Sequence, residues 1–89
     1  MKSVVKITGE DKIGIIAKIT GILAANKVNI LDINQTVKKD FFTMVMLVDT
    51  SKTSISYVEL KNKLEKTGKD MNLSVILQRE DIFNKLNEL

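Results

Sequence analysis

The stretch from Thr8 to Ile15 (TGEDKIGI) combines groups that can bind an anion and an ammonium ion. Gly14 directly precedes an apolar helical pattern, and free backbone N–H groups at a helix N-terminus attract carboxylates and phosphates. A glycine at that position lets a ligand approach the backbone closely. The Asp11 carboxylate can fix an ammonium group or can cap the helix. The stretch therefore predicts either a small-ligand loop or an ordinary turn, and the spacing alone leaves both open.

Few residues of this sequence could act in catalysis, because the sequence contains no cysteine and no histidine. Disulfides, thiolate zinc sites, nucleophile–histidine pairs and imidazole acid–base catalysis are therefore excluded. Carboxylates can act as acid and base when they are paired in a cleft, but Glu10 and Asp11 are adjacent in a loop and should diverge. We expect no catalytic residue, no metal site and no cofactor, and hence a protein that is not an enzyme.

The composition indicates one globular domain. Hydrophobic residues make up 44% of the 89 positions and charged residues 28%, close to the globular average, so disorder is not expected. The net charge of +3 is too small to indicate nucleic-acid binding without a dense basic patch. The longest apolar runs, such as 44–48, are far shorter than a membrane span, and the N-terminus lacks the apolar core of a signal peptide. We expect a soluble, cytoplasmic protein.

Hydrophobic periodicity predicts alternating strands and helices along the chain. Ser56 and Glu59 fit a capping box, which marks the start of the second long helix. Lys39 and Asp40 supply a turn between two strands. The predicted elements, in chain order, are a strand at 2–8, a helix at 14–26, strands at 28–38 and 41–49, a helix from Ser56 to near Gly68, a strand at 72–79 and a short helix at 81–89.

The predicted helix at 14–26 carries one apolar stripe. Gly21 weakens a helix interior by about 1 kcal/mol relative to alanine, and the usual reason for such a glycine is close packing against a neighbouring element. We therefore expect Gly21 to contact another part of the fold. Asn26 can adopt the left-handed conformation that ends helices, so we expect the helix to end there. The stripe consists of Ile15, Ile16, Ile19, Ile22 and Leu23.

The two middle strands differ in their patterns. Residues 41–49 are apolar on both faces, which is typical of a central strand covered on both sides. A chain of this size cannot fully cover both faces of a sheet, so the second face is expected to meet another chain or the C-terminal tail. Residues 28–38 alternate instead, with Leu31, Ile33, Gln35 and Val37 on one face and Ile30, Asp32, Asn34 and Thr36 on the other.

The order of the elements predicts an α+β fold, a ferredoxin-like βαββαβ sandwich with a short C-terminal helix. Both long helices should pack on one face of a four-stranded antiparallel sheet, with the first and third strands in its centre. We expect one domain at 1–79 and a helical tail at 80–89, with Asp81 as the cap of the tail helix. The tail either docks on a partner or packs on its own fold, and we favour packing on its own fold.

Residue types discriminate between the proteins that commonly use this fold. A metal chaperone needs a Cys-x-x-Cys pair, which is absent, and a small phosphatase needs an arginine near the first helix, whereas the only arginine is Arg79. An RNA-recognition module needs aromatic residues on the open face of its central strands, and the first strand has none. Nucleic acid is therefore a disfavoured partner, and a regulatory module for small ligands fits better.

The run DKIGII at 11–16, followed by a helix and then by KVNILDI at 27–33, resembles the opening of an ACT domain. The resemblance extends over about residues 2–79, and the predicted order of elements agrees with that family throughout. The runs ILDINQ at 30–35 and QREDIF at 78–83 further resemble stand-alone ACT proteins related to the glycine cleavage system regulator. The resemblance implies an amino-acid-sensing regulatory domain at 1–79.

The resemblance also implies where a ligand binds, because ACT domains hold an effector between two subunits. Gly14 and the backbone of Ile13 and Ile15 would meet the ligand carboxylate, and Asp11 occupies a position that is often a polar contact. Asn29 would contact the amino acid across the interface, or would only turn the chain into its strand. The resemblance therefore implies a homodimer that binds an amino acid or a similar small-molecule effector.

One departure from the family pattern leaves a second interpretation open. Most sensing ACT domains are fused to an enzyme or a DNA-binding domain, and we expect no such domain here. Any signal would then pass through a partner chain or through assembly. If the site has lost its ligand, the chain is instead a ligand-free protein–protein interaction module that regulates a partner enzyme or transcription factor.

Overall fold

The computed structural model describes residues 1–10 and 14–86. The strands and helices in these ranges follow the predicted order, with boundaries that differ from the predicted ones by a few residues. None of the helices in the described ranges combines the length and the hydrophobicity that crossing a membrane requires. The strands are β1 (Lys2–Glu10), β2 (Asn29–Lys38), β3 (Phe41–Asp49) and β4 (Ser74–Arg79), and the helices are α1 (Ile15–Ala25), α2 (Tyr57–Asp70) and α3 (Glu80–Leu86).

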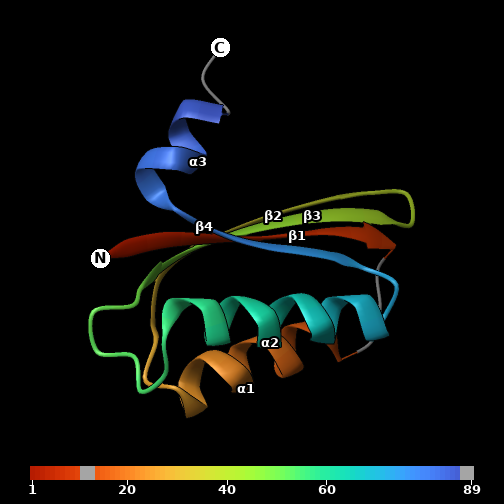
Figure 1. The fold of residues 1–89 in the computed structure, drawn as a ribbon. Helices are drawn as coiled ribbons and strands as arrows, with labels where there is room; N and C mark the ends of the chain where they lie inside the picture. Colours follow the sequence, from red (N-terminus) through yellow and green to blue (C-terminus); the bar gives the residue numbers. More distant parts are fainter. Residues whose placement is uncertain (11–13, 87–89) are drawn as a thin grey trace.

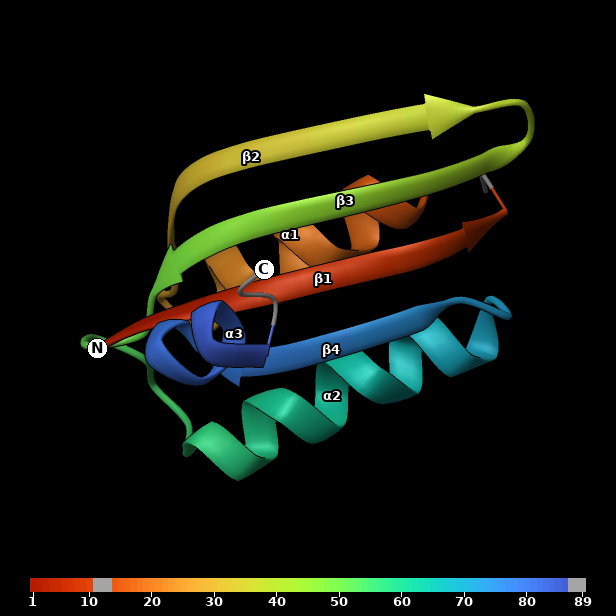
Figure 2. The ribbon, with the colours of Figure 1, turned by 90° about the horizontal axis from the view of Figure 1, so that it is seen from above.

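The strands form one antiparallel sheet in the order β2-β3-β1-β4. α1 and α2 lie side by side on one face of this sheet, and α3 lies on the opposite face (Figure 1, Figure 2). We call these two faces the helix face and the open face. The arrangement confirms the predicted ferredoxin-like βαββαβ sandwich, with β1 and β3 in the centre of the sheet.

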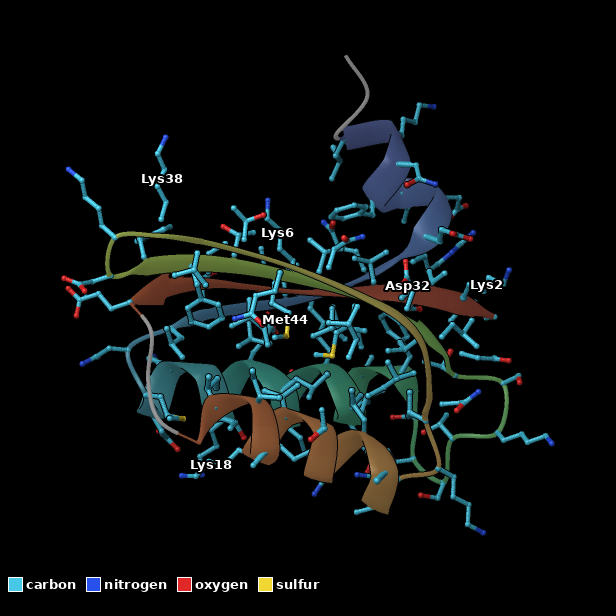
Figure 3. The ribbon with its side chains drawn as sticks, turned by 180° about the vertical axis from the view of Figure 1, so that it is seen from behind. Lys2, Lys6, Lys18, Asp32, Lys38 and Met44 are labelled. Atoms are coloured by element: carbon cyan, nitrogen blue, oxygen red, sulfur yellow. The ribbon has the colours of Figure 1, made fainter. Side chains whose placement is uncertain are left out.

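The helix face of the sheet carries the hydrophobic core. β1 pairs with β3 so that Val5 lies opposite Met46 and Ile7 lies opposite Met44, and all four side chains are buried. Figure 3 shows Met44 between the sheet and the helices. Burying a side chain of this size contributes roughly 1.5–3 kcal/mol, so this pairing stabilises the centre of the fold. The helices add Ile15, Ile19 and Leu23 from α1 and Leu60 and Leu64 from α2.

α2 begins with the predicted capping box. Ser56 is its N-cap residue, and Ser56 Oγ accepts a hydrogen bond from the Glu59 backbone N–H at 3.1 Å. The adjacent Tyr57 hydroxyl donates to the Leu77 backbone oxygen at 3.2 Å, which ties the start of α2 to β4. Partial burial raises the pKa of Tyr57, because it disfavours the charged phenolate.

The end of α1 differs from the prediction by one residue. Lys27, not Asn26, takes the left-handed conformation, with a φ of 60°. Asn26 instead donates its side-chain amide to the Ile22 backbone oxygen at 2.8 Å. The Val28 N–H reaches back to the Leu23 oxygen at 2.9 Å, as in a Schellman motif. This motif holds Lys27 at the end of the helix, close to the start of β2.

β2 is an edge strand, and none of its residues is fully buried. A register shift at Leu31 moves Ile30 to the helix face, opposite Val48, so the strict alternation predicted for this strand is wrong at its start. Beyond the shift, Ile33 and Val37 also lie on the helix face, but they remain 46% and 54% exposed. The apolar side of β2 is therefore open to solvent.

α3 lies against β1 and β4 on the open face, where Val4 is only 4% exposed. The C-terminal helix thus covers part of the second face of the sheet, which is one of the two predicted alternatives. α3 starts at Glu80, so the prediction that Asp81 caps this helix is wrong. Asp81 lies within the helix, where its carboxylate pairs with Arg79 at 2.7 Å. Residues 87–89 of the predicted helix lie outside the described residues.

Two helix glycines have opposite surroundings. A Cβ at Gly68 would lie 3.0 Å from Val75 Cβ and 3.1 Å from the Leu73 oxygen, with Val75 Cγ2 closer still, so Gly68 lets α2 approach β4. A Cβ at Gly21 would meet nothing within 4 Å, and Gly21 is exposed on α1. The expected close packing of Gly21 is therefore wrong within one chain, because no neighbouring element of the described residues comes into contact with this position of α1.

Gly68→Ala is expected to destabilise the fold by about 1–3 kcal/mol, because the added methyl group is forced against Val75 and Leu73. Gly21→Ala is the matched control and should raise the free energy of unfolding by up to about 1 kcal/mol, because alanine is the better helix former. Urea unfolding followed by circular dichroism measures both changes. A Gly68→Ala variant as stable as the wild type would contradict the close contact of α2 with β4.

Candidate functional site

Gly14 forms the start of α1 at one end of the sheet. It is the N-cap residue, it is exposed, and its φ of 86° is one that glycine adopts most readily. Gly14 has no side chain that could cap the helix, and the first turn of α1 contains no acidic residue. No side chain of the described residues caps this end, and backbone N–H groups at a helix N-terminus can donate to a carboxylate or a phosphate.

The other predicted loop residues are described only in part. Asp11 and Ile13 lie outside the described residues, so the choice between a ligand contact and a helix cap for Asp11 stays a prediction. Ile15 is 1% exposed, and its side chain belongs to the core. Only the backbone of Ile15 is therefore available to contact a ligand.

Asn29 lies at the other end of the sheet, at the edge of a small hollow of about 200 Å³. It is exposed, and it lies opposite Asp49 in the pairing of β2 with β3. The end of α1, the start of β2 and the turn after β3 meet here. This Asn29 hollow is lined by Lys27, Asn29, Asp49, Ser51 and Lys52.

The Asp49 carboxylate is the negative group of the Asn29 hollow. Its Oδ1 accepts a hydrogen bond from the Ser51 backbone N–H at 2.9 Å and lies 3.6 Å from the amino group of Met1. The hydrogen bond from Ser51 lowers the pKa of Asp49 most, and the positive charge of Met1 lowers it further. The carboxylate is therefore charged at neutral pH and can attract an ammonium group.

The Asn29 hollow offers complementary groups to a zwitterion. The ammonium groups of Lys27 and Lys52 can attract a carboxylate, and Asp49 can attract an ammonium group. The Asn29 amide can donate to a ligand carboxylate and accept from a ligand ammonium group. This set of groups is suited to hold a small molecule that carries both charges.

The two candidate regions do not meet within one chain. Gly14 begins α1 and Asn29 follows its far end, and the 11 residues of α1 span about 16 Å. The strand register agrees with this separation. Glu10, which ends β1, lies opposite Phe41, and Phe41 lies opposite Lys38 at the end of β2, whereas Asn29 is the first residue of β2. A single chain therefore presents the two candidate regions at opposite ends of the sheet.

Sequence reasoning missed Lys27, Asp49 and Lys52, which come together only where the ends of different elements meet. One signal was present, because Asp49 precedes Ser51 by two residues. That spacing favours a turn in which the aspartate side chain accepts a backbone hydrogen bond. Nothing in the sequence indicated that this turn lies beside Asn29.

Comparison with known proteins relates the whole chain to one family. An ACT domain model matches residues 3–78. The chain is 44% identical over 89 residues to a UPF0237 protein of Clostridium acetobutylicum, with 100% of both chains covered. Its structure is similar to that of an ACT domain protein from Streptococcus pneumoniae, with 36% identity, a TM-score of 0.77 and 93% of each chain covered. A candidate glycine cleavage system transcriptional repressor shares the fold, with 19% identity, a TM-score of 0.73 and coverage of 86% of this chain and 44% of that one.

Asp49→Asn tests the electrostatics of the Asn29 hollow, because it removes the charge but keeps an acceptor for the Ser51 N–H. The pKa of Asp49 is lowered in the folded chain, so its ionisation adds stability above the unfolded pKa of about 3.9. That contribution is lost as the pH falls through the folded pKa. The stability advantage of the wild type over Asp49→Asn should therefore shrink below about pH 4, as measured by urea unfolding. An advantage that stays constant with pH would contradict this account.

Proposed function

Because the chain belongs to the ACT domain family, we propose that it is a non-catalytic regulatory module that binds an amino acid or a similar small metabolite at a homodimer interface. The observation that carries the proposal is the separation of Gly14 from Asn29 by the length of α1. A ligand held by both residues requires two chains, and pairing of the two β2 edges supplies the necessary geometry.

The edge of β2 is the surface that a second copy would cover. A ten-residue strand with an unpaired edge is a ready template for another strand, and monomeric proteins usually protect such edges with charges. Residues 33–37 (INQTV) carry no charge that would oppose pairing. Nearby apolar side chains, on β2 and on the flank of α1 away from α2, would also be covered. They are Ile16, Leu31, Ile33 and Val37, which are between 42% and 54% exposed.

Antiparallel pairing around a twofold axis determines which ends meet. It places the Asn29 end of one β2 beside the Lys38 end of the other. The start of α1, with Gly14, lies at the Lys38 end of its own sheet, since β1 ends there with Glu10 next to Phe41. Gly14 of one copy and the Asn29 hollow of the second copy would therefore share one end of the extended sheet, and the dimer would contain two such sites.

Each composite site would recognise both charges of an amino acid. The N-terminus of α1, with the backbone N–H of Ile15, favours the ligand carboxylate. The Asp49 carboxylate and the Asn29 amide of the second copy favour the ligand ammonium group. By resemblance to the family, Asp11 and the backbone of Ile13 add contacts from the loop before α1. Because these contacts recognise the ammonium and carboxylate groups that all amino acids share, the side chain of the ligand is left for other residues to select.

The exposed side of α3 favours a second candidate function. Ile82 and Leu86 are 45% and 68% exposed, and no residue of this helix is buried. This open apolar side supports the alternative of a ligand-free interaction module that regulates a partner enzyme or transcription factor. The charged groups of the Asn29 hollow favour the ligand-binding homodimer, because an interface that only joins proteins needs no such zwitterion-matched set.

The chain is expected to sediment as a dimer at micromolar concentration, and Ile33→Lys is expected to make it a monomer. A lysine at this position places an unpaired charge in the covered edge. Ile76→Lys is the matched control, because this isoleucine is 39% exposed on β4, at the other edge of the sheet, and its variant should remain a dimer. Sedimentation velocity measures all three proteins. A monomeric wild type would rule out the homodimer and the site at its interface.

Thermal unfolding with a panel of amino acids and nucleotides is expected to reveal at least one ligand. A ligand at a hundred times its dissociation constant adds about 2.7 kcal/mol of stability. For a domain of this size that raises the unfolding temperature by on the order of ten degrees. A panel without any response at millimolar concentrations would argue against ligand binding and would favour the interaction module.

Asn29→Ala should weaken binding of the identified ligand by about tenfold, because one side chain hydrogen-bonded to a charged group contributes about 1.5 kcal/mol. The ligand-free variant should unfold at the wild-type temperature, since the replaced side chain is exposed. Asn34→Ala is the matched control, as Asn34 is exposed on the open face of the same strand and should not contact the ligand. Isothermal titration calorimetry measures both affinities. Equal losses in the two variants would place the ligand elsewhere.

A further inference from the structure

A groove runs between α1 and α2 on the solvent side of the helical layer. Its volume is about 510 Å³. Ala17, Gly21 and Ala25 form its wall on α1, and all three are exposed. Neither Gly14 nor Asn29 lines this α1–α2 groove, so it is separate from the two half-sites of the proposed ligand site.

Gly21 is the one glycine of the chain that the fold of a single copy does not explain. Gly9 and Gly14 have positive φ angles, and Gly68 packs directly against Val75, whereas Gly21 has open space around it. Glycine is a poor helix former, and exposed helix positions normally carry charged or long polar side chains. A glycine there leaves room for the backbone of another molecule to approach α1 closely.

The spacing of the small residues matches the shape of a helix. Ala17, Gly21 and Ala25 recur at every fourth position, so they form one line along α1 that is about 12 Å long. The side-chain ridge of a further helix packs into such a line between two helices. The groove therefore fits an elongated helical occupant better than a compact ligand.

Lysines line both sides of the α1–α2 groove. Lys18 comes from α1, Lys63 and Lys66 come from α2, and all three are exposed. Figure 3 shows Lys18 on the side of α1 that points away from the sheet. No acidic residue lines the groove, Asp70 lines a smaller hollow beside it, and these lysines form no ion pair with any residue of the described ranges. The groove thus combines a small apolar wall with a positive rim.

We propose that the α1–α2 groove docks an acidic amphipathic helix of a partner protein. Glutamates or aspartates beside an apolar ridge would meet the positive rim while the ridge packs along Gly21. The same groove of a second copy does not fit, because lysines would face lysines. α3 of a second copy fits poorly, because its described part has 7 residues, with Glu80 and Asp81 together in its first turn and Lys85 in its last turn, and so offers no acidic residues along its length. The proposal stands whether or not the amino-acid site exists.

Selection from a displayed library of helical peptides, with the full chain as bait, tests the proposal. The selected peptides are expected to be acidic on both sides of an apolar ridge. Their synthetic forms should bind the Lys63→Glu/Lys66→Glu double variant at least tenfold more weakly than the wild type, because like charges then face each other. The Lys38→Glu/Lys39→Glu double variant makes the same charge change at the exposed β2–β3 turn and should bind as the wild type does.

Gly21→Gln separates docking from folding. The glutamine side chain would fill the line of small residues, so peptide binding should fall at least tenfold. The position is open and glutamine is the better helix former, so the same variant should unfold at a higher temperature than the wild type. A purely structural role of Gly21 would instead lower the unfolding temperature.

Several results would overturn the proposal. One is a set of selected peptides without net negative charge, and another is acidic peptides that still bind Gly21→Gln with wild-type affinity. A third is tripolyphosphate binding that depends on Lys63 and Lys66 while no acidic peptide is selected, which would indicate a small-anion site. Asn29→Ala should bind the peptides normally, so that a failure of the amino-acid site and a failure of the groove can be told apart.

Discussion

The antiparallel pairing of β1 with β3 is the constraint on which the rest of the structure depends. Both strands are nine residues long, and their helix-face side chains, including Ile7 and Met44, are excluded from water. Because these strands occupy the centre, β2 and β4 become the edges of the sheet, and α1 and α2 must cover the face that carries the core. The surfaces left over include the β2 and β4 edges, the outer side of the helices and the part of the open face beyond α3. These are the surfaces with which the chain can act on other molecules.

The same topology gives a regulatory module a simple mechanism. α1 carries the chain from the end of β1 back to the start of β2, so Gly14 and Asn29 lie one helix length apart whatever their side chains do. A ligand that contacts both residues would bind the proposed dimer and not the single chain, so it would stabilise the dimer by mass action. Ligand concentration would then set the proportion of dimer, and neither copy would need to change shape.

α1 takes part in both proposed interactions, because each of its two flanks presents a different surface. Ile16 is exposed outside the α1–α2 groove, on the flank where the second copy would pack, and Gly21 lines the groove, where the acidic helix would dock. Both flanks belong to one rigid helix anchored by buried Ile15, Ile19 and Leu23. Assembly through one flank therefore leaves the other accessible, and a partner could bind the dimer at two equivalent grooves.

Sequence patterns were sufficient to predict the features that depend on neighbouring residues or on the two faces of one element. The order of the elements, the capping of α2 by Ser56 and the central place of β3 were all predicted correctly, because periodicity and capping are local. The ACT resemblance drew attention to Gly14 and Asn29, and their ligand contacts stay predictions. Which distant residues meet became known only from the folded chain. The fold placed Asp49 beside Asn29, left Gly21 facing solvent and shifted the register of β2, because the packing of separate elements is not encoded in the pattern of any one of them.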